Sequence, residues 1–340
     1  MSGSMARAIF MEWWGMKILS GRSVDRRGAL SLLGAAAAVP LLRAPAAAQS
    51  DMTIRIAYIP FEASAQLFYA QELGLWSKAG LDVQLQPNPF GAAIAAAVAS
   101  GAVDIGYATI MTLASAHAKK LPFTIVAAAN AFDVSQPPGG MLMSASKDVR
   151  KGVDLNAKII GSPGLNTLGE YGVRAWVDAG GGDATTLKFV ELPFSEMPAA
   201  LATGRIDAAF VAEPFVGPAK KVAHTVAIEF DAIANSFLVA GWFTTNAWAK
   251  THPRAIALFA QSMRTAVEWA QKNPTLCPPI LAKYLKIDPL VVAASPRAYF
   301  AKALDPAQLQ PGIDLTAKYA KFPTFPASEI IYEPPRRHLL

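Results

Sequence analysis

Two ten-residue stretches, VASGAVDIGY at 98–107 and LATGRIDAAF at 201–210, repeat one pattern position by position. Each reads as the end of a helix, a glycine turn, an aspartate and a buried strand, and each follows an Ala-rich helical run. Two copies of one αβ unit predict two lobes of similar build. A cleft between two such lobes is where a ligand is expected to bind.

Strands and helices alternate around each copy of this unit. In the first half the predicted strands are 53–59, 81–86, 104–107 and 123–129, with a helix at 64–72. In the second half the predicted strands are 158–161, 187–191 and 207–211, with helices at 167–179 and 195–203. This order is typical of sheets covered on both faces by helices. The predicted class is therefore α/β, with two doubly wound, mainly parallel sheets.

Two apolar segments, Gly139–Ser144 and Val239–Thr244, are predicted to cross between the lobes as a two-strand hinge. The first part of lobe I is then 49–144, and lobe II is 145–238. The last segment, 239–340, holds the returning hinge strand and the C-terminal helices of lobe I, with a long amphipathic helix at 255–271.

The first 48 residues have the features of a secretory leader. Arg26 and Arg27 precede the uncharged run Gly28–Leu42, and Ala46–Ala48 supplies a small-residue cleavage site. The paired arginines favour the twin-arginine (Tat) route, with cleavage near Ala48. The apolar run is too short to span a bilayer. We therefore expect the protein to be exported to the periplasm.

Charge and cysteine content exclude some functions. The first 48 residues hold six Lys/Arg and two acids, which is +4 of the total of +6, so the remainder carries about +2. No basic stripe with interleaved aromatic residues occurs, so a nucleic-acid partner is not expected. Cys277 is the only cysteine, so no intrachain disulfide can form, and we interpret it as a small apolar residue.

In open α/β sheets, ligands bind beyond the carboxyl ends of the strands, where helices begin and free N–H groups are available. This rule selects six loops: 60–63, 89–91 and 108–110 in the first half, and 162–167, 193–195 and 212–215 in the second. The aspartates of the repeated unit, Asp104 and Asp207, lie at the opposite ends of their strands. We interpret both as structural turn residues.

Two of these loops carry polar groups with two possible roles. Gly164 permits close backbone approach, and Asn166 or Thr167 could either bind a ligand or only cap the following helix. Glu213, before Pro214, could accept from a ligand hydroxyl, amine or ring N–H, or it could cap its own helix. The sequence leaves both alternatives open.

Aromatic residues recur in the same loops, and Trp242 lies on the returning segment. Alone, each is typical of a core, but several converging on one cleft would form an aromatic clamp. The predicted ligand-binding residues are Phe61, Glu62, Phe90, Gly91, Thr109, Asn130, Ser162, Gly164, Asn166, Thr167, Phe194, Glu213 and Trp242.

The sequence carries none of the common catalytic or metal-binding signatures. The four histidines, His117, His224, His252 and His338, show no metal-ligand spacing. No nucleophile elbow, zinc-protease or phosphate-loop motif occurs. We therefore expect no catalytic residues, no metal and no cofactor.

Several short motifs resemble one family of solute-binding proteins, those of the nitrate, sulfonate, taurine and pyrimidine-precursor class of ABC importers. They are Ala70–Trp76, Ala79–Val83, the Ala-Ser-Gly-x-Val-Asp turn, Asp154-Leu155, Gly164, and Leu201–Ala208 followed by Glu213-Pro214. The resemblance implies the two-lobed periplasmic-binding-protein fold. It also implies hinge closure on a small solute and delivery to an ABC permease and its ATPase, by a protein expected to be monomeric.

The chain departs from that family in ways that bear on the ligand. Asn156-Ala157-Lys158 replaces the usual Gly-Lys-Lys, Leu165 stands where oxyanion-binding members often have Ser, and none of the six loops contains Arg or Lys. Nitrate or sulfonate would need more donors or charge. We therefore favour an aromatic or heterocyclic solute, oriented by Asn166 and Glu213.

The sequence is also compatible with three other functions. One alternative is a sulfonate- or nitrate-type oxyanion-binding protein. Another is an enzyme on the same fold, like the pyrimidine-precursor synthases, although those carry a cysteine cluster and an active-site histidine that this chain does not match. A third is a receptor that presents its ligand to a membrane sensor.

Overall fold

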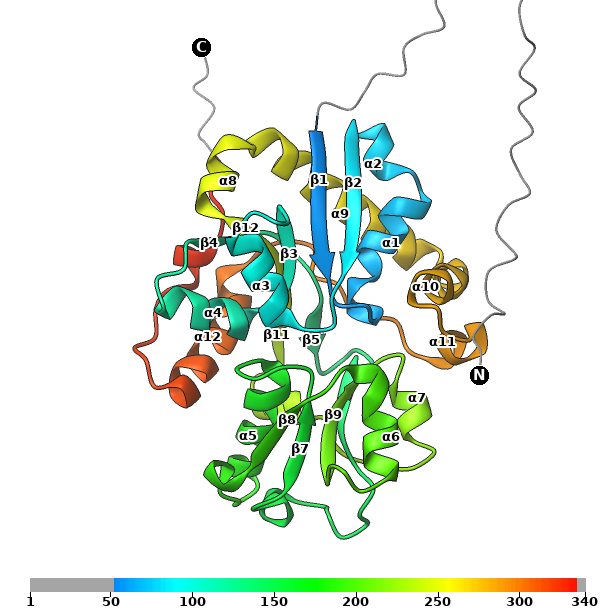
Figure 1. Cartoon of the computed structure of the whole chain (residues 1–340), viewed down its shortest axis with the longest axis vertical. Coiled ribbons are helices and arrows are strands. Elements are labelled where there is room, and N and C mark those ends of the chain that lie inside the picture. Colours follow the sequence, from blue (N-terminus) through cyan, green and yellow to red (C-terminus); the bar gives the residue numbers. More distant parts are fainter. Residues whose placement is uncertain (1–51, 335–340) are drawn as a thin grey trace, which may run out of the picture. The chain divides into compact units, whose positions relative to one another are not determined.

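The computed structural model describes residues 52–334 (Figure 1). The predicted leader, 1–48, and His338 lie outside this range. Within it, no helix combines the length and the apolar character that a membrane crossing requires.

The first sheet has five strands in the order β2-β1-β3-β12-β4. They are β1 (Met52–Tyr58), β2 (Leu81–Pro87), β3 (Ile105–Thr109), β4 (Phe123–Ala128) and β12 (Ala240–Thr245). β1 runs parallel to both β2 and β3, whereas β12 is antiparallel to β3 and β4. A strand from late in the chain therefore completes the sheet.

Helices cover both faces of this sheet. The helices are α1 (Ala65–Glu72), α2 (Leu75–Lys78), α3 (Gly91–Ala99), α4 (Ile110–Ala118), α8 (Asn246–Thr251), α9 (Pro253–Lys272), α10 (Cys277–Leu285), α11 (Pro289–Ala294) and α12 (Pro306–Ala320). Successive residues of a strand point to opposite faces. Accordingly, Ile54 and Ile56 belong to the core that includes α1 and α9, and Ala57 belongs to the core of α3, α4 and α12.

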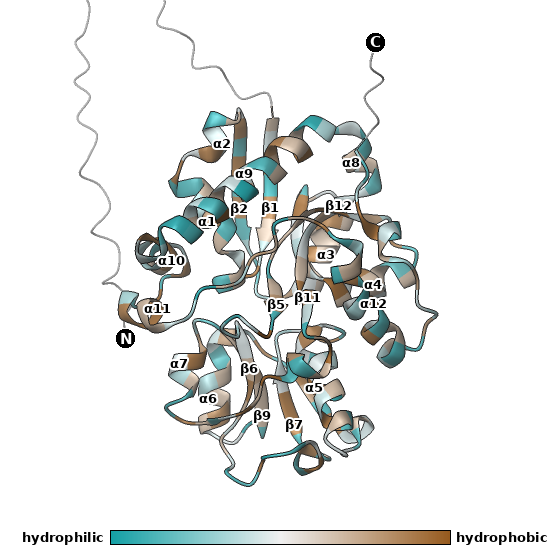
Figure 2. Cartoon of the chain, turned by 180° about the vertical axis from the view of Figure 1, so that it is seen from behind, coloured by the Kyte–Doolittle hydropathy of each residue, from teal (hydrophilic) through white to brown (hydrophobic). Residues whose placement is uncertain are grey.

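The second sheet repeats this arrangement, in the order β10-β6-β9-β7-β8. Its strands are β6 (Gly140–Ser144), β7 (Ile159–Ser162), β8 (Lys188–Glu191), β9 (Ala208–Ala212) and β10 (His224–Ala227), and its helices are α5 (Leu168–Ala179), α6 (Met197–Ala202) and α7 (Val216–Ala219). Strands β7 and β9 are largely hydrophobic (Figure 2). β7 is parallel to β8 and β9, and β6 is antiparallel to β9 and β10. The predicted α/β class with two mainly parallel sheets is confirmed.

The connection between the sheets is two-stranded, as predicted, but its residues differ from the predicted ones. β5 (Ala131–Asp133) pairs antiparallel with β11 (Ser236–Leu238) in a separate two-stranded sheet. The segments predicted to cross, Gly139–Ser144 and Val239–Thr244, instead largely coincide with β6 and β12, which complete the second and first sheets. A short apolar run has the same pattern in a crossing strand as in a buried sheet strand, so the sequence could not separate the two. The lobe limits at 144 and 238 remain predictions, and β6 belongs to the second sheet.

The aspartate of the repeated unit has the same structural role in both sheets. Asp104 accepts from the backbone N–H of Arg55 on β1 at 2.8 Å, and Asp207 accepts from that of Ile159 on β7 at 2.8 Å. The preceding glycines, at 101 and 204, have φ of +75° and +70°, a conformation that favours glycine. Both aspartates therefore join neighbouring parallel strands, as their structural interpretation predicts.

Candidate functional site

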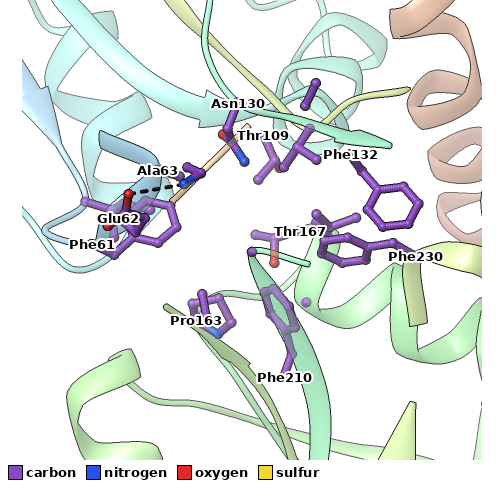
Figure 3. A pocket seen from close by; sticks show the side chains of 18 of the residues that line it. Phe61, Glu62, Ala63, Thr109, Asn130, Phe132, Pro163, Thr167, Phe210 and Phe230 are labelled. Carbon is purple, nitrogen blue, oxygen red and sulfur yellow. Dashed lines mark hydrogen bonds between the residues drawn. The ribbon is translucent and has the colours of Figure 1, made fainter. Parts of the chain in front are cut away.

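A cavity with a volume of about 80 Å³ lies where the carboxyl ends of strands from both sheets meet. Each of the six loops predicted from the strand-end rule contributes to its lining: the lining includes Phe61, Gly91, Thr109, Pro163, Phe194 and Ala212. Figure 3 shows Asn130 and Thr109 across the cavity from Pro163, Thr167 and Phe210. A water needs about 10–15 Å³ of such volume, so the space corresponds to roughly six waters, or one small organic molecule.

Seven of the described residues that line the cavity are aromatic. They are Phe61, Tyr107, Phe132, Phe194, Phe210, Phe230 and Tyr299. Phe61 follows β1 of the first sheet and Phe194 follows β8 of the second, and their rings stack with centroids 5.4 Å apart and an interplanar angle of 20°. Phe132, on β5, meets Phe230 edge to face at 5.5 Å. Aromatic rings therefore line the cavity from both halves of the chain and from the connection between the sheets.

The polar part of the lining has no cationic group. Among the described residues that line the cavity, the polar ones are Glu62, Thr109, Thr112, Asn130, Asp133, Gln136 and Thr167, besides Tyr107 and Tyr299, and none is Lys, Arg or His. Arg174, which follows on helix α5, pairs with Glu170 at 2.8 Å instead. An anionic ligand would meet no cationic side chain in this part of the lining.

The cavity unites about half of the predicted binding residues. Phe61, Glu62, Gly91, Thr109, Asn130, Thr167 and Phe194 line it, while Phe90, Ser162, Gly164, Asn166, Glu213 and Trp242 do not. Phe90 is half-buried at the start of α3. Sequence reasoning missed five of the seven aromatic residues in the lining. Phe210 and Phe230 fit a core equally well in sequence, so no local signal distinguished them.

The turn from Ser162 to Thr167 satisfies its own polar groups. The hydroxyls of Ser162 and Thr167 both donate to the carbonyl of Gly164 at 2.8 Å. Asn166 is exposed, with φ of +58°, and its side-chain oxygen accepts from the hydroxyl of Tyr171 at 2.8 Å. Of the two roles left open by the sequence, the contacts favour the structural one for Ser162, Gly164 and Asn166.

Trp242 lies behind the cavity in the core. It is fully buried, and its indole N–H donates to Gln66 Oε1 at 2.9 Å. Its ring meets Tyr107 edge to face with centroids 5.4 Å apart. Trp242 therefore supports a lining residue and does not itself face the cavity.

Glu62 and Glu213 meet at a buried junction between the sheets. The backbone N–H of Glu62 donates to the carbonyl oxygen of Glu213 at 3.1 Å. Glu62 is 2% exposed, and its carboxylate accepts from the backbone N–H of Ala298 at 3.1 Å and lies 3.3 Å from the Arg297 guanidinium. Burial raises the pKa of Glu62 to about 7, although Arg297 opposes the shift. Burial also raises the pKa of Glu213, which does not line the cavity.

Arg297 is the member of this junction that the sequence did not reveal. Its guanidinium donates to the carbonyl oxygens of Val292 and Ser295 at 2.5 and 2.6 Å. Only the tertiary fold brings this C-terminal segment to Glu62. The arginine lies beside the buried carboxyl group of Glu62 and is absent from the described cavity lining.

Solved structures with this fold come from proteins of several functions. The alkanesulfonate-binding protein of Xanthomonas axonopodis pv. citri is 18% identical, with a TM-score of 0.68 over 82% of this chain and 98% of that one. The nitrate-binding protein of Synechocystis is 14% identical, with a TM-score of 0.65 over 84% and 92%. The desulfurization enzyme DszB is 13% identical, with a TM-score of 0.59 over 82% and 96%. At these identities the likeness establishes the periplasmic-binding-protein fold.

Comparison by sequence establishes the family. A Brucella abortus protein, named only as a binding protein, is 25% identical over 254 residues, which are 72% of this chain and 75% of that protein. The family model described as NMT1/THI5 like matches residues 62–276, well over half of the chain. The chain therefore belongs to the NMT1/THI5-like family.

Proposed function

We propose that this protein is the solute-binding component of an ABC importer, and that it captures a small, uncharged aromatic or heterocyclic solute. The observation that carries the proposal is the aromatic cavity between the two sheets, whose described lining includes no cationic side chain. Such pockets, mostly apolar with a few polar groups, are typical of small-molecule binding sites. The sulfonate- and nitrate-binding proteins of the same fold support the importer class.

Ligand capture follows from the position of the cavity. A solute there contacts Phe61 and Asn130 from the first half of the chain and Thr167 and Phe194 from the second. It stabilises the closed state through contacts that an open state would lack, and that differential affinity shifts the equilibrium. We place the bend in the two-stranded β5–β11 connection, because the chain passes through β5 and β11 on its way between the two sheets.

The charge of the lining argues against the oxyanion alternative. Nitrate and sulfonate binding is favoured by arginine, lysine or multiple N–H donors. Apart from tyrosines, the ionisable groups in the described lining are the carboxyls of Glu62 and Asp133. Hydrogen bonds from Ser135 lower the pKa of Asp133 and keep it ionised. A negatively charged ligand would be repelled by this carboxylate.

The enzyme alternative has less support from the cavity. DszB shows that the fold can carry catalysis. The described lining contains no Ser, Cys, His or Lys that could act as a nucleophile, and Cys277 is buried elsewhere. For a binding protein, we propose export to the periplasm, a permease with its ATPase as partners, and a monomeric state.

Titration of the purified protein tests the proposal. We expect isothermal titration and thermal-shift measurements to show binding of neutral ring compounds, with no binding of nitrate or methanesulfonate. Mass spectrometry of ligand that copurifies should identify an aromatic or heterocyclic molecule. Tight binding of a small alkylsulfonate alone would overturn the proposed ligand class, and turnover of a bound compound would overturn the proposed function.

A further inference from the structure

The amide of Asn130 lies at the point where the chain passes between the sheets. Its backbone carbonyl accepts from the N–H groups of Val239 and Ala240 at 3.0 and 3.2 Å. The next residue, Ala131, donates to the carbonyl of Tyr299 at 2.8 Å. The backbone of Asn130 is thus held from two sides, so its side chain projects into the cavity from a fixed base.

Tyr107 sets the orientation of that amide. Its hydroxyl donates to Asn130 Oδ1 at 2.7 Å. The Tyr107 side chain is 1% exposed and lies edge to face with both Phe61 and Trp242. A buried hydroxyl that loses its acceptor incurs the full desolvation penalty. The amide oxygen of Asn130 must therefore face Tyr107, and its nitrogen must face away.

The nitrogen of this amide faces the cavity. Figure 3 shows the Asn130 nitrogen directed into the space between Thr109 and Thr167. Within residues 52–334, Asn130 Nδ2 has no hydrogen-bond acceptor, and it is not among the polar atoms sealed from solvent. The cavity therefore contains an oriented N–H donor with no protein partner among the described residues.

We infer that Asn130 determines specificity by donating to an uncharged acceptor on the ring solute, a carbonyl oxygen or a pyridine-type ring nitrogen, and that Tyr107 is the positioning residue for this contact. The inference rests on the proposed function and narrows its ligand class. A charged acceptor, such as a carboxylate or sulfonate, would meet the carboxylate of Asp133 in the same lining. A solute without an acceptor would leave the donor desolvated and unpaired.

Matched ring probes separate these possibilities. Acetophenone and isopropylbenzene have the same number of non-hydrogen atoms, and only acetophenone has a carbonyl acceptor. Benzenesulfonate adds a negative charge, and benzylamine adds a positive donor. Isothermal titration of the full protein should show acetophenone binding about tenfold more tightly than isopropylbenzene, as expected when a desolvated donor finds or lacks its acceptor.

Four variants test the roles of the two residues. Asn130→Leu should bring the affinity ratio of acetophenone to isopropylbenzene near one. Asn130→Asp should weaken acetophenone binding and strengthen benzylamine binding, a gain that unfolding cannot mimic. Tyr107→Phe should lower the ratio in part, because the freed amide can turn. Tyr284→Phe is the matched control, since it removes a hydroxyl that bonds Glu72 at 2.8 Å outside the cavity.

The outcomes distinguish a failure of the Asn130 donor role from a failure of the proposed ligand class. An equal affinity of wild type for acetophenone and isopropylbenzene would overturn the role of Asn130 and leave an aromatic-binding protein. If Asn130→Leu keeps the wild-type ratio of acetophenone to isopropylbenzene affinity, the role of Asn130 is also overturned. If no ring probe binds while methanesulfonate or nitrate does, the proposed ligand class itself fails. The inference is supported if the ratio of acetophenone to isopropylbenzene affinity falls in Asn130→Leu and Tyr107→Phe but stays unchanged in Tyr284→Phe.

Discussion

At the amino ends of their strands, the two sheets share one set of hydrogen bonds. Asp104 and Asp207 each accept from a backbone N–H of the neighbouring parallel strand. The antiparallel strand adds a second bond in each sheet: Thr244 donates to the carbonyl of Asp104 at 2.6 Å, and Ser144 donates to that of Asp207 at 2.7 Å.

At the carboxyl ends the same two units diverge. β3 ends at Thr109, which caps α4 by accepting from the N–H of Thr112 at 3.3 Å and lines the cavity. β9 leads to Glu213, which is buried at the junction with Glu62 and Arg297 and lies outside the lining. The hydrogen bonds at the amino ends of the strands are therefore repeated in the two units, whereas the contacts at the carboxyl ends, beside the cavity, are not. The difference suits the asymmetric ring solute that we propose.

The largest expected effect is the pH dependence of stability from buried carboxyls, one in each half. Burial raises the pKa of Glu229 to about 8 and that of Glu62 to about 7, from 4.5. The unfolded chain releases these protons above about pH 4.5, while the folded protein retains them to about pH 8 and 7. The free energy of unfolding should therefore fall as pH rises, by up to about 1.4 kcal/mol per pH unit for each group.

Urea unfolding at pH 5 to 9 measures this slope. Glu229→Gln should flatten the profile up to about pH 8, and Glu62→Gln only up to about pH 7. Glu196→Gln, at an exposed position, is the control. Profiles that coincide with that of wild type would show that these carboxyls do not carry the pH dependence.

The second prediction concerns the hydrogen bonds that Asp104 and Asp207 make in the two sheets. Asp104→Ala removes bonds to the backbone N–H of Arg55 and to its guanidinium, at 2.8 to 3.0 Å. We expect a loss of about 3 kcal/mol for Asp104→Ala and about 2 kcal/mol for Asp207→Ala, since hydrogen bonds to charged groups contribute about 1.5–3 kcal/mol. Chemical denaturation measures both losses. Ligand affinity should stay within about twofold, because both aspartates lie outside the cavity lining.

A third prediction concerns the ligand end. Phe194→Ala removes a ring that lines the cavity and stacks on Phe61. We expect an affinity loss of about 2 kcal/mol, or roughly thirtyfold, for a ring ligand. Phe215→Ala is the matched control, since Phe215 stacks on Phe194 at 6.5 Å but does not line the cavity. Equal losses in both variants would assign Phe194 to packing alone.

The smallest effect concerns the charged partners of the two aspartates. Lys158 lies 3.6 Å from Asp207 with 45% of its side chain exposed, whereas Arg55 lies 2.8 Å from Asp104 with 38% exposed. Solvent screens such pairs, so Lys158→Met should change the free energy of unfolding by less than about 0.5 kcal/mol and Arg55→Met by up to about 1 kcal/mol. A larger loss for Lys158→Met, measured by urea unfolding, would contradict this order.

The repeats and the strand-end rule predicted where the cavity would lie, and all six predicted loops contribute to its lining. They did not predict which side chains in those loops face it. In the turn from Ser162 to Thr167, the hydroxyl and amide groups that suggested a ligand bond to the turn itself. Tyr107 is a buried strand residue by pattern, and only the tertiary structure reveals that its hydroxyl donates to Asn130 Oδ1.

The sequence by itself determined the αβ repeats, the α/β class and the two structural aspartates, because hydrophobic periodicity, glycine turns and strand ends are local properties of the chain. Tertiary structure alone decided the route between the sheets through β5 and β11, the junction of Glu62 with Arg297, and the orientation of the Asn130 amide. Each of these depends on contacts between residues far apart in the chain. No local pattern encodes such contacts, because they form only when the sheets and the C-terminal segment pack together.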